Sequence, residues 1–196
     1  MPELSKSLDL LLTAIEGRYP QWHIPRPLSG TSHTELEAAR VALDVGEIEL
    51  FEFLKLYDFD CCQLFPFIEQ FRAVEMAAKR SSIFAMYDDA NSTFEEAFTG
   101  WTSSTLESCK LDQSWRKSWI PIGQANANFV FVDLEPSNSG VVGQIVETSE
   151  DGRYLTVIAS SFTHLLDRIR AVIENDEASD ADYKWLSVGA ISSHAE

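Results

Sequence analysis

The feature of the sequence that most restricts its fold lies between residues 129 and 159, where three short apolar runs follow one another. These runs are 129–134, 141–147 and 153–159, and the turn-forming sequences Pro-Ser-Asn-Ser-Gly and Glu-Asp-Gly separate them. The pattern predicts three consecutive antiparallel strands. The sequence Trp-Ile-Pro-Ile-Gly at 119–123 is expected to add a fourth. Residues 129–134 are apolar on both faces until Asp133, as expected of a central strand.

An amphipathic helix is predicted directly after the last strand. Its apolar residues recur at helical spacing and form one stripe. The stripe consists of Phe162, Leu165, Leu166, Ile169, Val172 and Ile173. We expect this stripe to cover the sheet.

The first half of the chain has helical periodicity. A first amphipathic helix is predicted from the stripe Leu4, Leu8, Leu11, Leu12 and Ile15. The prolines between residues 20 and 27 end this helix. A second helix is predicted to begin at Thr34, with Thr34 and Glu37 as a capping box. Its apolar face is expected to include Leu36, Ala39 and Leu43.

Two more helices and an irregular segment are expected before residue 119. The chain is predicted to break near Gly46 and to resume as a helix whose inward residues are Ile48, Phe51, Leu54 and Tyr57. A helix over 68–79 is predicted to place Phe71, Val74 and Ala78 on one side. The segment 86–114 has weak periodicity and many serines and threonines, which indicates loops with one short helix.

These elements predict an α+β domain, with helices packed on an antiparallel sheet of about four to six strands. A chain of 196 residues is long enough for one domain with a sizeable core. We assign residues 1–175 to this domain and residues 176–196 to an acidic C-terminal tail. The stretch 174–182 carries five acids and no base, so the tail is expected to be solvated.

The charge of the chain restricts its partners. There are 31 acidic and 15 basic residues, which gives a net charge of −16. Such a field repels nucleic acid and anionic membranes and attracts cationic partners. No run approaches the length of a membrane span, and Glu3 and Asp9 interrupt the apolar character that a secretion signal requires. We therefore expect a cytoplasmic protein that binds neither nucleic acid nor membrane.

Motifs of known chemistry are absent from the sequence. The glycines form neither of the usual phosphate-binding patterns, and no Gly-x-Ser-x-Gly nucleophile motif occurs. The four histidines are scattered, and no spacing of Cys, His or acids fits a zinc or calcium site. We predict no catalytic residue, no metal and no cofactor.

Asp133 and Glu135 are the remaining candidates for chemistry. They are two residues apart on a strand, so they share a face and could serve as an acid–base pair. A hydrolase of this kind would need a deep cleft and a carboxylate of raised pKa. An acid at a strand end commonly accepts hydrogen bonds from the N–H groups of the turn. Asp133 is therefore interpreted as a turn acid or as a contact residue.

Residues 114–169 resemble the C-terminal half of the SUKH superfamily, the Smi/Knr-like proteins. The resemblance lies in short motifs that occur in the order typical of the family. They are Trp119 with Ile120-Pro121-Ile122-Gly123, Asp133-Leu134 with Pro136, Gly143-Gln144-Ile145, and Ala159-Ser160 with Phe162. The upstream segments 35–43, 49–59 and 69–77 are similar in outline. The Asn-Gly or Asp-Gly usual after the second of these is replaced here by Asp-Phe-Asp-Cys-Cys.

The resemblance implies a SUKH-like domain that binds proteins and is not an enzyme. Many bacterial members are immunity proteins, which neutralise a polymorphic or secretion-system-delivered toxin in the cytosol, frequently a nuclease. The acidic charge agrees with this role, because a nuclease site that holds phosphates is cationic. The expected partner is a basic cognate toxin. The alternative is a regulatory or scaffold module without a toxin partner, as in fungal relatives that regulate cell-wall synthesis.

The predicted contact residues are acids outside the helical stripes, together with one tryptophan. Aromatic residues often dominate the energy of an interface. The set is Asp88, Asp89, Glu95, Glu96, Trp101, Asp133 and Glu135. Plain solvation is the alternative interpretation of each acid.

Overall fold

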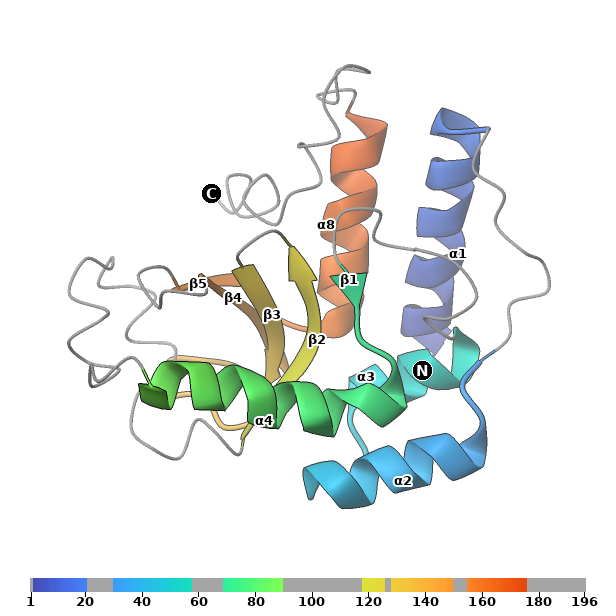
Figure 1. Ribbon diagram of the computed structural model, residues 1–196. Helices are drawn as coiled ribbons and strands as arrows, with labels where there is room; N and C mark the ends of the chain where they lie inside the picture. The colour runs from blue at the N-terminus through green and yellow to red at the C-terminus, as the bar shows by residue number, and fades with distance from the viewer. Residues whose placement is uncertain are drawn as a thin grey trace.

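Figure 1 shows the computed structural model, which describes residues 2–20, 30–57, 69–89, 118–125, 128–149 and 155–175. The described elements confirm the predicted α+β class, with helices first, a meander of strands and a closing helix. In chain order they are α1 (Pro2–Arg18), α2 (His33–Leu43), α3 (Glu49–Leu56), β1 (Glu69–Gln70), α4 (Ala73–Asp89), β2 (Trp119–Ala125), β3 (Asn128–Asp133), β4 (Gln144–Ser149), β5 (Leu155–Ala159) and α8 (Phe162–Glu174).

The strands form one antiparallel sheet in the order β1-β2-β3-β4-β5. Sequential order of this kind follows from the short connections that the sequence places between β3, β4 and β5. The four predicted strands are confirmed, and β3 is the central strand, with residues 129–133 all buried. Across the sheet, Asp133 lies opposite Trp119 on β2 and opposite Gln144 on β4. This register brings together the residues of the site described below.

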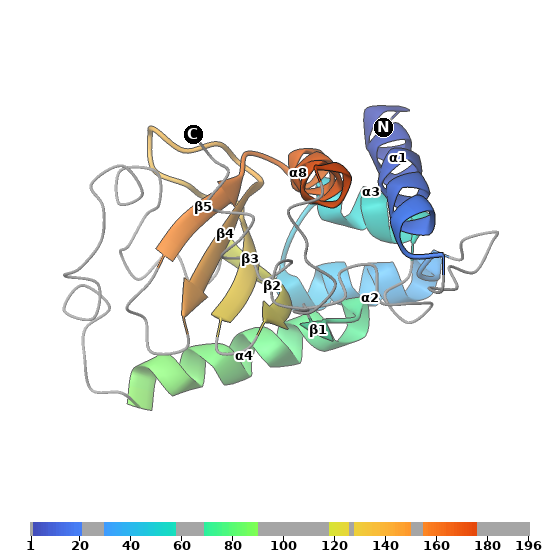
Figure 2. The same cartoon turned by 90° about the horizontal axis from the view of Figure 1, so that it is seen from above.

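The predicted stripes of α1 and α8 are buried in the core, as expected. The two helices lie side by side, which both views show (Figures 1 and 2). The α8 helix contacts β4 and β5, in agreement with the prediction that it packs on the sheet, and it also packs along α1. The α3 helix joins this layer through Phe53, whose ring centroid lies 4.6 Å from that of Phe162.

The start of α2 differs from the prediction. The N-cap is Ser32, whose Oγ accepts the Glu35 N–H at 3.3 Å, while the Glu35 carboxylate accepts the Ser32 N–H at 3.3 Å. The capping box is therefore Ser32 with Glu35, and the predicted box at Thr34 and Glu37 is wrong. Glu37 instead forms an ion pair with Arg40 at 2.9 Å.

The end of α2 and the inward residues of α2 and α3 agree with the sequence. The helix breaks at Asp44, a left-handed residue with φ of 56°, close to the predicted break at Gly46. Ile48 is the half-buried N-cap residue of α3. The other predicted inward residues are buried, namely Leu36, Ala39 and Leu43 on α2 and Phe51, Leu54 and Tyr57 in and after α3.

The predicted helix over 68–79 is shifted in both its bounds and its phase. Phe71 is buried, but it follows β1 and donates its N–H to the Ile122 carbonyl at 3.0 Å, so it belongs to the sheet edge. A helix that included Phe71 would place Val74 and Ala78 on its inward face. In the structure Val74 is 44% exposed, and Ala78 is exposed as well. The inward residues of α4 include Ala73, Met76 and Ile83.

The irregular segment predicted over 86–114 is corrected at its start. The helix α4 continues to Asp89, so Asp88 and Asp89 belong to a helix and not to a loop. The remainder of that segment lies outside the described residues. The predicted tail at 176–196 lies outside them as well.

Candidate functional site

Asp133, the last residue of β3, is enclosed by the protein, with 0% of its surface exposed. Its Oδ1 accepts the N–H of Glu135 at 3.0 Å, and its Oδ2 accepts Nε2 of Gln144 at 2.9 Å. Both carboxylate oxygens are therefore engaged by the following turn and by the neighbouring strand. This is the arrangement expected of a structural turn acid.

The environment of Asp133 shifts its pKa upward. Burial raises the pKa, because a low-dielectric interior disfavours the charged form, and the nearby charge of Glu135 raises it further. Hydrogen bonds from the Glu135 N–H and from the side chain of Gln144 lower the pKa, but burial dominates. The raised pKa is one of the two features that the hydrolase hypothesis required.

The burial of Asp133 decides between its interpretations. A side chain without exposed surface does not touch a partner, so the structure supports the turn acid and corrects the placement of Asp133 among the contact residues. The same enclosure separates the carboxyl from solvent and substrate. Glu135, two residues later, is exposed. The two carboxylates therefore do not present a common surface.

Asp133 and Gln144 together hold the loop 134–143. Besides its bond to Asp133, Gln144 forms two hydrogen bonds with Val141 in the loop. Its Oε1 accepts the Val141 N–H at 3.1 Å, and its backbone N–H donates to the Val141 carbonyl at 2.9 Å. The Gly143 N–H donates to the Asp133 carbonyl at 2.7 Å. Gly143 has φ of 86°, a left-handed conformation that glycine adopts without a steric cost. The buried pair thus fixes the geometry of an exposed loop.

Of the other predicted contact residues, the described part of the chain includes two. Asp88 and Asp89 are the last two residues of α4. Glu95, Glu96 and Trp101 lie outside the described residues. These five residues remain predictions.

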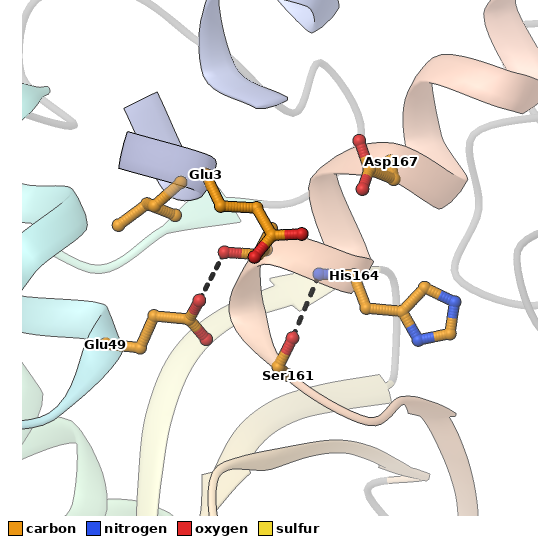
Figure 3. Close-up of a pocket in the computed structure, with 7 residues that line it drawn as sticks. Glu3, Glu49, Ser161, His164 and Asp167 are labelled. Atoms are coloured by element: carbon orange, nitrogen blue, oxygen red, sulfur yellow. Dashed lines mark hydrogen bonds between the residues drawn. The ribbon is translucent and has the colours of Figure 1, made fainter. Parts of the chain in front are cut away.

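A pocket that the sequence did not predict lies where α1, α3 and α8 begin (Figure 3). Its volume is about 250 Å³. Three carboxylates contribute to the lining, and no Lys or Arg does. The lining residues are Glu3, Leu4, Glu49, Ser161, Thr163, His164 and Asp167. The only local signal for this site is the presence of an acid in the first turn of α1 and of α3.

Glu49 shows why acids gather in this pocket. Its carboxylate accepts the Phe162 N–H at 2.9 Å and the hydroxyl of Thr163, so the first residue of α3 caps the first turn of α8. Ser161 is the N-cap of α8, and its Oγ accepts the His164 N–H at 3.1 Å. Negative charge is stabilised at helix N-termini, where backbone N–H groups point outward.

The convergence of Glu3, Glu49 and Asp167 makes the potential in the pocket negative, which favours a cationic group over an anionic one. Within the described ranges, no group of three or more His, Cys, Asp or Glu residues is arranged to hold a metal ion. None of the described helices combines the length and the apolar character needed to cross a membrane.

The antiparallel meander and its packed helices form an α+β domain that is consistent with the SUKH fold. The chain belongs to the SMI1/KNR4 family (SUKH-1), whose family model matches residues 43–168. The match begins at the last residue of α2 and ends within α8, so α1 and most of α2 lie outside it. A comparison with curated proteins finds no match. The resemblance stated from the sequence motifs is confirmed.

Proposed function

We propose that this chain is an immunity protein that binds a cognate bacterial toxin in the cytoplasm and neutralises it by direct contact through an acidic surface. The observation that carries the proposal is a net charge of −16 on a member of this family. The strongly negative field disfavours nucleic acid as a direct ligand and favours a basic protein.

The electrostatics favour a nuclease as the target. A nuclease active site must attract phosphates, so its surface is cationic, and an acidic protein is drawn to the same surface. Steering of this kind raises association rates to about 10⁸–10⁹ M⁻¹s⁻¹ at low salt. The pocket that joins Glu3, Glu49 and Asp167 illustrates how folding gathers acids from distant segments. Fast capture matters because a toxin acts catalytically.

The test is co-expression with the protein encoded by the adjacent gene. We expect this chain to restore growth to cells that express that protein. The purified chain should bind a catalytically inactive form of it, with an association rate that falls steeply as salt rises. A lack of binding at low ionic strength, with either terminus free of tags, would contradict the proposal.

A regulatory or scaffold module is the second candidate, because membership of the SMI1/KNR4 family is compatible with that role too. It predicts several weak and transient partners and no toxin encoded beside the gene. Growth rescue and salt-sensitive capture of the adjacent gene product distinguish the immunity protein from this alternative.

A further inference from the structure

We propose that Val141 and Val142, at the end of the loop 134–143 that leads into β4, form with the exposed Glu135 of the same loop a surface that contacts the toxin. The inference rests on the proposed function and adds to it the position of the interface. The partner that fits this surface is a protein with an apolar recess bordered by Lys or Arg residues.

The two valines are unusually exposed for apolar residues. Val141 is 54% exposed and Val142 is 70% exposed, and they follow the sequence Glu-Pro-Ser-Asn-Ser-Gly at 135–140. Single exposed apolar residues such as Val41 and Val74 are ordinary on a protein surface. Among the described residues, Val141 and Val142 are the one pair of consecutive large apolar side chains that both exceed half exposure. Removing exposed apolar side chains from water favours association, so a partner that covers both valines gains affinity from their burial.

The loop is held in place before any partner arrives. Two hydrogen bonds to Asp133 hold the C-terminal end of the loop. The Gln144 side chain donates to the Asp133 carboxylate, and the Gly143 N–H donates to the Asp133 carbonyl. The Gly140 N–H donates to the Ser137 carbonyl at 3.0 Å within the loop. An ordered loop loses less conformational entropy on binding, so its contacts contribute more fully to affinity. The buried Asp133 therefore acts on the interface by positioning the loop.

The charge of the chain selects the kind of partner. A second copy of the chain would bring two charges of −16 together, and an anionic membrane would be repelled in the same way. The loop contains an exposed acid, Glu135, and no Lys or Arg. In Figure 2 the loop, drawn in gold, and α4 lie on opposite sides of the strands. A cationic protein with an apolar recess is complementary both to the negative charge of the chain and to the two exposed valines.

The test compares two double variants of the full chain. Val141→Ser/Val142→Ser removes the proposed anchors, and Val41→Ser/Val74→Ser removes two exposed valines from α2 and α4 as the matched control. The probe is the purified, catalytically inactive product of the adjacent gene. We expect the loop variant to lose about tenfold or more in affinity, because two apolar side chains no longer contribute their burial, and mainly through faster dissociation. The control should stay within about twofold of the unmodified chain.

Each outcome separates this inference from the proposed function. If the unmodified chain binds the probe and the loop variant binds within about twofold of it, the inference is wrong and the proposed function stands. If the unmodified chain neither binds nor rescues growth, both fail. Light scattering that shows a dimer, lost in the loop variant, would assign the loop to a second copy and overturn the inference. The single variant Val142→Ser, at the more exposed position, provides the same comparison if the double variant misfolds.

Discussion

Replacing Asp133 with Asn should destabilise the fold, although the two side chains have nearly the same volume. Asp133 now accepts hydrogen bonds on both oxygens, from the Glu135 N–H and from Nε2 of Gln144. The Asn side chain supplies one oxygen and one NH₂ group, which would face the NH₂ group of Gln144. Gln144 cannot turn its amide without losing the Val141 N–H, which its Oε1 accepts. One buried donor is left without its acceptor.

The magnitude follows from these contacts. A hydrogen bond to a charged group contributes about 1.5–3 kcal/mol, and a buried donor left unsatisfied costs about 1–3 kcal/mol. The substitution also removes the cost of burying a carboxylate, which is the cause of the raised pKa of Asp133. We expect a net loss of about 1–2 kcal/mol in the free energy of unfolding at neutral pH. For a domain of this size that corresponds to a decrease in Tm of about 2–8 °C.

The assay is urea unfolding at pH 7 together with calorimetry. The control is Asp167→Asn, which removes an acid of α8 whose side chain is 39% exposed and pairs with Arg170 at 3.8 Å. Exposed pairs of this kind contribute little, so the control should change stability by less than about 0.5 kcal/mol. An Asp133→Asn variant as stable as the unmodified chain, or more stable, would show that Asp133 and Gln144 do not anchor the loop.

The remaining predictions concern pH, a close backbone approach and a helix cap. The pKa of Asp133 is higher in the folded than in the unfolded state, so the stability that its protonation contributes is fully present below pH 3.8 and is lost as pH rises through the folded pKa. Urea unfolding at a series of pH values should therefore show the unmodified chain gaining stability relative to Asp133→Asn as the pH falls from neutral to acidic. Gly30→Ala places a Cβ 1.9 Å from the Lys55 carbonyl oxygen, so calorimetry should show a loss of about 1–3 kcal/mol in the free energy of unfolding. At Gly46 an added Cβ meets nothing within 4 Å, so Gly46→Ala should leave that free energy without a loss of this kind. Glu49→Ala removes the acceptor of the Phe162 N–H and should cost about 1–2 kcal/mol in urea unfolding; an unchanged midpoint would show that the cap on α8 is dispensable.

Strongly periodic elements could be predicted from the sequence. The stripes of α1 and α8 repeat over three or more turns, so a single misjudged residue does not change which face is apolar. The central strand β3 is apolar on both faces, and short turns fix its neighbours. The position of Asp133 at a strand end predicted either a turn acid or a contact residue. Its complete burial, which decides between the two, depends on packing that the sequence does not display.

Features that depend on tertiary partners could not be predicted. The strand β1 has two residues and exists because Glu69 and Gln70 pair with the edge of β2. The capping box predicted at Thr34 and Glu37 falls inside α2, because the helix begins at His33, directly after the N-cap Ser32. The acidic pocket joins Glu3 and Glu49 with α8, which are far apart in the sequence and meet only after α1, α3 and α8 have packed. Local sequence patterns do not show which residues from distant segments come together in the folded protein.

We propose that this acidic chain neutralises a basic toxin by occluding it. This is measured by titrating the purified chain into the purified, active product of the adjacent gene and following the remaining nuclease activity. We predict complete loss of activity near equimolar chain, with activity returning as salt rises, because screening weakens the electrostatic part of the complex. Full activity in the presence of excess chain at low salt would show that the chain does not occlude this protein.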